Sequence, residues 1–258
     1  MDLSRASADI TWTISRISSL ENLSLRYRKL CSWNQFVHIN HLQKLKSLQV
    51  RGFPIFSWKG ITLPKLKHLR LESLGDQWSD FMKRTQLESL EVYDKSMTDF
   101  SLQTAFRCLP KLKRLELYRC RNITDEGLQH IQSLEHIEEL RLWGIDISGD
   151  TFRMWYRLSS LKKLFIYASN AIDDIALIEM DIKLPSLQQV VLYDCFKITP
   201  NAMEGLKKSL PCCEILQIFR GQALPLSLKR ETQIYTRTYK FPAGVLKMPP
   251  PHSVTYLS

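Results

Sequence analysis

One short pattern recurs along this chain, and its spacing constrains the fold more than any other feature of the sequence. The pattern is Leu-x-x-Leu-x-Leu, in which Ile, Val or Cys replaces some of the leucines. Its nine copies begin at Leu20, Leu45, Leu66, Leu87, Leu112, Ile137, Leu161, Leu187 and Cys213. Successive copies start 25, 21, 21, 25, 25, 24, 26 and 26 residues apart. A steady period of this length indicates a chain built from repeated strand-and-connection units.

Each copy has the alternation of a strand. In the copy that starts at Leu112, Leu115 and Leu117 are two residues apart and share a buried face, whereas Arg114 and Glu116 point the other way. One strand and one connection cannot bury their own apolar faces, so neighbouring units must stack. The sequence therefore predicts an α/β fold: a right-handed, horseshoe-shaped solenoid of leucine-rich repeats with a parallel sheet on its concave side.

The segments after the strands carry helix-start signals. Five of them contain residues that cap a helix or suit its first position, namely Thr98-Asp99, Thr124-Asp125, Ser148, Asp173 and Thr199-Pro200. Apolar residues then recur at helical spacing, as in Leu128, Ile131 and Leu134. We expect a mostly helical convex side. The 21-residue copies are too short for a full helix, so turns or extended chain are expected between Val50 and Leu87.

The period sets the expected domain organisation. Residues 1–19 resemble a partial N-terminal repeat or cap, and residues 20–221 hold the repeats. Residues 222–258 leave the pattern and are expected to form a C-terminal cap followed by a basic, proline-containing tail. The chain has no run of about 18 apolar residues and no signal-peptide core, so we expect an intracellular protein, in the cytoplasm, the nucleus or both.

Cysteine usage agrees with that location. Two of the six cysteines, Cys120 and Cys195, stand three residues after the last strand leucine, where a buried thiol acts as a small apolar residue. Without a secretory signal, reduced structural cysteines are the expected state.

A family resemblance rests on these positions. The stretch LKRLELYRCRNITDEGL, residues 112–128, resembles the cysteine-containing repeat of F-box/leucine-rich-repeat proteins. The stretch LQQVVLYDCFKITPNAM, residues 187–203, repeats the Cys-x-x-Ile-Thr signature with Pro200 in place of the aspartate. The leucine pattern covers roughly residues 10 to 221, and the cysteine signature occurs twice.

The resemblance implies a substrate-recognition module of a Skp1/cullin ubiquitin ligase. In that family the repeats bind the target protein, an F-box docks the ligase scaffold, and other subunits perform the transfer. No F-box is present in this chain, so Skp1 and cullin are expected partners only if an F-box lies outside it. The alternative is a repeat-only scaffold or inhibitor that resembles the Amn1-type proteins and does not recruit a ligase.

The outward strand positions predict a partner-binding face. The last outward position carries Arg26, Arg51, Glu72, Tyr93, Tyr118, Trp143, Tyr167, Tyr193 and Phe219 in successive copies. Strands about 4.8 Å apart would stack the six consecutive aromatic residues into a ladder. The ladder either contacts a protein partner or only stabilises the edge of the solenoid.

Two further features lie on the same face. Phe165, Val191 and Ile215 are expected to form an exposed apolar patch with Tyr167 and Tyr193. Outward charged residues of the two preceding strands are candidates for cross-strand pairing, which would leave a self-satisfied lattice; they are Arg114, Glu116, Glu139 and Arg141.

The net charge of +10 is concentrated in the N-terminal third. Between Asn22 and Arg70 there is no Asp or Glu, but there are ten Lys and Arg residues. The inner face of this block is expected to hold Arg26, Arg51, His68 and Arg70, which suit an acidic or phosphorylated protein substrate. Nucleic acid is a weaker alternative because no nucleic-acid motif accompanies the block.

The sequence contains none of the common catalytic or ligand-binding motifs. There is no glycine-rich phosphate loop, no His-Glu-x-x-His helix and no Gly-x-Ser-x-Gly turn. We therefore expect a binding protein that is not an enzyme, with no catalytic residues, no cofactor and no metal.

Overall fold

Each copy of the leucine pattern forms a strand. In the computed structural model, the described residues are 16–26, 38–52, 57–74, 77–145, 147–156 and 158–219. Within these ranges, nine strands pair in parallel, in chain order. They are β1 Asn22–Arg26, β2 Ser47–Arg51, β3 His68–Leu71, β4 Ser89–Val92, β5 Arg114–Tyr118, β6 Glu139–Trp143, β7 Lys163–Tyr167, β8 Gln189–Tyr193 and β9 Glu214–Ile218. The predicted parallel sheet of a leucine-rich-repeat solenoid is confirmed.

The chain divides into two compact units, Met1–Arg220 and Gly221–Ser258. All described residues belong to the first unit. The predicted tail, residues 222–258, lies outside the described residues, as does the predicted N-terminal cap up to residue 15.

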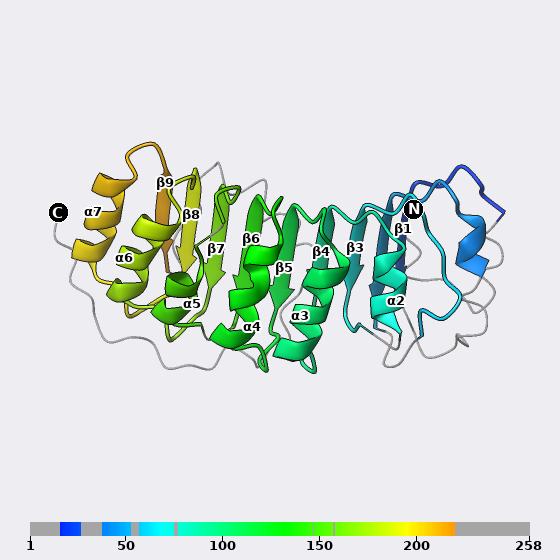
Figure 1. Ribbon diagram of the computed structural model, residues 1–258, viewed down its shortest axis with the longest axis horizontal. Coiled ribbons are helices and arrows are strands. Elements are labelled where there is room, and N and C mark those ends of the chain that lie inside the picture. The colour runs from blue at the N-terminus through cyan, green and yellow to red at the C-terminus, as the bar shows by residue number, and fades with distance from the viewer. Residues whose placement is uncertain are drawn as a thin grey trace. The chain divides into compact units, whose positions relative to one another are not determined.

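Helices cover one side of the sheet (Figure 1). They are α2 Trp78–Lys83, α3 Asp99–Cys108, α4 Asp125–Gln129, the short 3₁₀ helix η2 His130–Ser133, α5 Gly149–Met154, α6 Asp174–Lys183 and α7 Pro200–Ser209. The five predicted starts are correct. The side chains of Thr98, Thr124, Ser148, Asp173 and Thr199 each accept a hydrogen bond from a backbone N–H of the following first turn.

The prediction for the short repeats is partly wrong. Residues 57–67 cross to β3 through turns, as expected, but α2 lies between β3 and β4. This six-residue helix buries Phe81 and Met82, and Trp78 packs partly against the core. Phe81 also stacks on Trp58 at a ring-centroid distance of 4.1 Å. Three large apolar residues at helical spacing therefore stabilise a single helical segment in a 21-residue repeat.

The helices are aligned by a ladder of carboxylates. Asp99 accepts hydrogen bonds from the backbone N–H and the hydroxyl of Thr124, the cap of the next helix, at 2.8 and 2.7 Å. Asp125 does the same for Ser148, and Asp174 for Thr199. In α5 the first residue is Gly149, at the position where α3, α4 and α6 have an aspartate. The cap of the next helix, α6, is Asp173, which has no hydroxyl to donate to a carboxylate at that position. A second carboxylate there would face a like charge.

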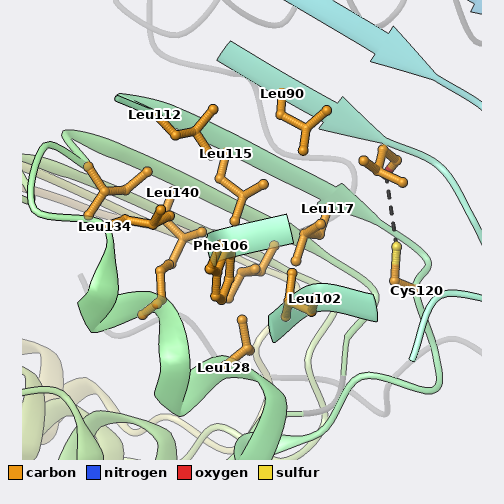
Figure 2. Packing of buried hydrophobic residues seen from close by; sticks show 14 of the residues in the cluster. Leu90, Leu102, Phe106, Leu112, Leu115, Leu117, Cys120, Leu128, Leu134 and Leu140 are labelled. Carbon is orange, nitrogen blue, oxygen red and sulfur yellow. Dashed lines mark hydrogen bonds between the residues drawn. The ribbon is translucent and has the colours of Figure 1, made fainter. Parts of the chain in front are cut away.

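The core lies between the strands and the helices. Figure 2 shows Leu115, Leu117 and Leu140 from the strands packed with Leu102 and Leu128 from the helices. Cys120 is fully buried, and its thiol lies 3.9 Å from the Val92 carbonyl oxygen. Cys195 is also fully buried, 3.8 Å from the Ile166 carbonyl oxygen. Burial raises the pKa of both thiols to about 11, so neither is a nucleophile at neutral pH.

The last strand is shifted by one residue from its predicted position. Glu214 pairs with Gln189 and Ile215 with Val190, so Ile215 points into the core instead of outward. Because side chains alternate along a strand, this shift moves every residue of β9 to the opposite face of the sheet from the one predicted. Gln217 points inward, where its amide nitrogen lies 3.4 and 3.3 Å from the carbonyl oxygens of Cys195 and Ile198. Those carbonyl contacts satisfy a polar side chain at the end of the sheet.

Candidate functional site

We call the side of the strands that faces away from the helices the sheet face. Register pairing places the first, third and fifth residues of each strand on it, in columns that run across the sheet. Most predicted site residues lie on this face, and they are contributed by successive repeats.

The aromatic ladder is present, with five rings instead of six. Tyr93, Tyr118, Trp143, Tyr167 and Tyr193 follow one another, with ring centroids 4.8, 5.6, 3.4 and 5.9 Å apart. The rings of Trp143 and Tyr167 are nearly parallel, at 3°. The Arg119 guanidinium lies 5.5 Å from the Tyr118 ring centroid, within the range of a cation–π contact. The ladder is therefore a continuous stack of rings that crosses five repeats. Four of its rings are half-buried, and Tyr167 is only 4% exposed.

Phe219 does not belong to the ladder. The shift in β9 places Ile218 beside Tyr193 in the column, and Phe219 follows the strand. Its ring stacks instead on Phe196, in the loop after β8, at a centroid distance of 5.6 Å. The prediction that Phe219 is the sixth ring of the ladder is therefore wrong.

The predicted exposed apolar patch is also wrong. Phe165 and Val191 do lie in the middle column, but they are only 0% and 1% exposed, and Ile215 lies in the core. Part of the reason is visible at Phe165, where the Arg141 guanidinium carbon lies 3.8 Å from the ring centroid. Tyr167 lies parallel to the same ring at 6.4 Å. Neighbouring large side chains thus cover the apolar residues of this column.

Three of the ten basic residues in the predicted block form ion pairs. Acidic residues that lie outside the block in sequence pair with it in space: Lys46 with Glu21, Lys67 with Glu88 and Arg70 with Glu91, each at 2.7 Å. Of the predicted sites, Arg51 is buried, and the Arg26 side chain lies outside the described part of the chain. The sequence interval contained no acid, but parallel stacking brings one from an adjacent repeat.

His68 contributes little positive charge at neutral pH. Burial lowers the pKa of His68, and the nearby positive charge of Arg114 lowers it further. The Arg114 guanidinium lies 3.5 Å from the His68 ring nitrogen Nδ1. The imidazole is therefore not expected to act as a cation toward a phosphate.

Two acidic residues of the middle column were absent from the predicted site. Glu91 and Glu116 are neighbours in register, flanked in the column by Arg70 and Arg141. Burial raises the pKa of Glu91, against the opposing effect of Arg70 and Arg51. The signal was already in the sequence, since the middle column reads Arg, Glu, Glu, Arg across β3 to β6. The predicted lattice was one of pairs between neighbouring strands, whereas Arg141 pairs with Glu139 of its own strand.

The described residues offer no evident place for a metal ion. No group of three or more His, Cys, Asp and Glu side chains among them is arranged to hold one. No helix in the described ranges is long and apolar enough to cross a lipid bilayer.

Known structures share the fold. No protein-family model matches the sequence. Rad7 from yeast, solved in complex with Elc1, superposes with a TM-score of 0.53 at 18% identity, over 84% of this chain and 67% of Rad7. An internalin (inlF) from Listeria monocytogenes superposes with a TM-score of 0.52 at 16% identity, over 82% of this chain and 66% of the internalin. At these identities the likeness establishes the leucine-rich-repeat fold alone.

Proposed function

We propose that the chain is a protein-binding module whose sheet face holds a segment of another protein. The observation that carries this proposal is the ladder from Tyr93 to Tyr193, a continuous stack of aromatic rings on a rigid sheet, in which every ring except Tyr167 is partly exposed. Tyr and Trp are enriched where proteins meet because they offer a large contact area at a small entropic cost. The parallel strands hold the rings in register, so little ordering is required on binding.

At the finer level, we propose that the chain selects substrates for a Skp1/cullin-type ubiquitin ligase. Support comes from the two Cys-x-x-Ile-Thr repeats, whose thiols are buried, and from the shared fold of Rad7 in its complex with Elc1. Under this proposal the chain binds and does not catalyse, and it acts in the cytoplasm or the nucleus. A repeat-only scaffold that recruits no ligase is the second candidate, since no F-box is present in this chain.

The charged residues of the sheet face indicate the chemistry of the partner. Arg70 and Glu91 form an ion pair whose side chains are 14% and 23% exposed, and Arg141 pairs with Glu139. A partner that approaches this face therefore meets paired charges beside aromatic rings. We propose that an acidic or phosphorylated substrate competes with Glu91 for Arg70, and that the ladder supplies most of the contact.

The test is affinity purification from native extract, followed by mass spectrometry, with two baits: this chain and, if the gene encodes one, a form extended upstream. We expect Trp143→Ala to lose the specific companions of the parent protein, because it removes the ring that stacks on Tyr167 at 3.4 Å. Phe100→Ala is the matched control: Phe100 is 76% exposed and lies on α3, on the helical side. Thermal unfolding of each variant separates lost binding from lost folding.

The outcomes separate the candidates. Skp1 and a cullin among the companions would support the ligase module. Ligase subunits with the extended bait only would mean that this chain is the recognition part alone. Companions that depend on Trp143 but include no ligase subunit with either bait would support the repeat-only scaffold. If Trp143→Ala leaves the set of companions unchanged, the ladder does not contribute to binding, and the ring stack serves stability alone.

A further inference from the structure

The residues that precede the strands form two rows along one edge of the sheet. Because the nine strands are parallel, their first residues all lie at this edge, which we call the strand-start edge (Figure 1). From β2 to β5, the residue directly before each strand donates its backbone N–H to the carbonyl oxygen of its equivalent one repeat earlier, at 2.7 to 2.9 Å. This inner row holds Glu21, Lys46, Lys67, Glu88 and Lys113.

The inner row balances its own charge. Lys46 pairs with Glu21 at 2.7 Å. Glu88 accepts from Lys67 at 2.7 Å and from Lys113 at 3.2 Å. All three lysines of the row therefore have a carboxylate of a neighbouring repeat as their partner.

The outer row, two residues further from each strand, contains no acid. Before β2 to β5 it holds Lys44, Lys65, Gln86 and Lys111, all of them exposed. Lys111 Nζ donates to the neutral Gln86 Oε1 at 2.6 Å. Lys44 and Lys65 form no ion pair with any residue that the structure describes. Like charges about 4.8 Å apart, one strand spacing, repel each other, so the stability of the fold does not explain this row.

The ends of two helices add positive charge near the outer row. Arg84 is the C-cap of α2, and Arg107 lies in the last turn of α3. Both helices end next to the strand-start edge, because each leads from the end of one strand to the start of the next. Asp80, the acidic residue of α2, is already paired with Lys83 of the same helix at 3.3 Å.

The basic surface stops at the sixth strand and is continuous with the sheet face. Before β6, the exposed Glu135 and His136 replace the proline and lysine that precede β5. Arg114, the first residue of β5, is exposed and follows Lys113 of the inner row directly. Its guanidinium lies 3.5 Å from His68 Nδ1 in the first column of the sheet face. A partner on the sheet face can therefore extend onto this edge without crossing an acidic region.

We propose that the strand-start edge from β2 to β5 binds an acidic stretch of the polypeptide whose other part lies on the sheet face. The proposal rests on the proposed function, which supplies a protein partner there. Aspartate or glutamate carboxylates pair with Lys44, Lys65 and Lys111, and replace Gln86 as the contact of Lys111. Lysine is a compact charge on a flexible stem, so this edge selects negative charge and not one exact sequence.

An acidic polypeptide fits this edge better than a nucleic acid does. Proteins that hold single strands combine basic groups with aromatic side chains on which the bases stack. The inner and outer rows contain no Phe, Tyr or Trp before β2 to β5. The outer row spans three strand spacings, about 14 Å, which about four residues of extended chain can cover. A short acidic run is therefore sufficient.

Fluorescence anisotropy of a labelled polyglutamate peptide with the whole chain tests the edge. We expect saturable binding that weakens as ionic strength rises. The triple variant Lys44→Gln, Lys65→Gln and Lys111→Gln should bind at least about tenfold more weakly, because three ion pairs are lost together. The matched control is Lys95→Gln, Arg121→Gln and Lys197→Gln. It removes the same charge from exposed residues that follow strands, at the opposite edge, and should bind as the parent protein does.

Two outcomes of this titration would overturn the proposal. The first is a peptide that does not bind, or that loses affinity equally in the triple variant and in its control. The second comes from competition: a single-stranded oligothymidylate that displaces the peptide more effectively than unlabelled polyglutamate of equal charge would assign the edge to nucleic acid. We expect the polyglutamate to be the better competitor.

Trp143→Ala separates this proposal from the proposed function. Trp143 ends β6, at the opposite edge, so this variant should bind polyglutamate as the parent protein does. If Trp143→Ala retains all native companions while the three lysines still hold the peptide, the ladder fails as a binding surface and the edge stands. If Trp143→Ala loses its companions but the parent protein does not bind the peptide, the edge alone fails.

Discussion

Single atoms decide whether a residue is tolerated at the helix starts of this solenoid. Gly127 of α4 lies so close to the carboxylate ladder that a Cβ atom there would be 2.1 Å from Asp99 Oδ1. Asp99 cannot turn aside freely, since its two oxygens hold Thr124. The glycine is required by this close approach and by nothing in its own backbone conformation.

Gly127→Ala should therefore destabilise the protein by roughly 1–3 kcal/mol, the usual cost of overpacking. Gly205→Ala is the matched control, because its Cβ would enter open space within α7. There the better helix propensity of alanine should raise the free energy of unfolding by up to about 1 kcal/mol. Urea denaturation of both variants measures the difference, and equal effects would contradict the steric argument.

Thiol reactivity should follow burial among the described cysteines. Cys212 is exposed, whereas Cys120 and Cys195 are fully buried with a pKa raised to about 11. Iodoacetamide at neutral pH should modify Cys212 in the native protein and should reach the two buried thiols only after unfolding. Mass spectrometry of the labelled peptides measures the extent of modification at each cysteine. Native labelling of Cys120 at the rate of Cys212 would show that the repeat core opens.

At the scale of the elements, ion pairs connect successive strands along the edge where the strands begin. Glu88, just before β4, accepts from Lys67 before β3 at 2.7 Å and from Lys113 before β5 at 3.2 Å. One carboxylate thus bridges three repeats. These two lysines lower the pKa of Glu88 from 4.5 to about 2.

A lowered folded-state pKa makes this bridge sensitive to acid. Its stabilisation is present above pH 4.5 and is lost as the pH falls toward 2. Glu88→Gln should reduce stability slightly at neutral pH, by about 1 kcal/mol or less for pairs exposed to solvent. The variant should also lose less stability than the parent on acidification. Thermal melts across this pH range test both points, and an identical acid dependence would exclude Glu88 as a cause.

At the scale of the first compact unit, stability comes from neighbouring repeats that share one core. Leu140 of β6 lies at the centre of the sheet and is fully buried (Figure 2). Each repeat contacts mainly the repeats beside it, so a cavity in the middle weakens two interfaces at once.

Leu140→Ala should cost about 2–5 kcal/mol of unfolding free energy. Ile182→Ala removes a 63% exposed side chain and should change the free energy of unfolding little. Because the core is continuous, tryptophan fluorescence and far-UV circular dichroism should report the same urea midpoint for the parent protein. Separate midpoints would mean that the repeats unfold in independent blocks.

Local chemistry was enough to predict the repeats, the parallel strands and five helix starts. A strand alternates every two residues, and a cap needs only a hydroxyl or carboxylate beside the helix, so both signals are contained within a few residues. The ladder from Tyr93 to Tyr193 also followed from the sequence, because equal repeats place equal positions side by side. The failures lie where repeats are unequal: α2 forms in a short repeat, and β9 starts one residue early.

What only the tertiary structure decided is how each side chain is covered and paired. Arg70 and Glu91 are 21 positions apart and Lys46 and Glu21 are 25 apart, yet each pair is in contact because parallel stacking makes distant positions neighbours. The same stacking buries Phe165 under Arg141, which no local pattern shows. The sequence by itself thus determined the backbone architecture, through short-range periodicity. The charge and exposure of its faces depend on contacts between repeats, which form only when the chain has folded.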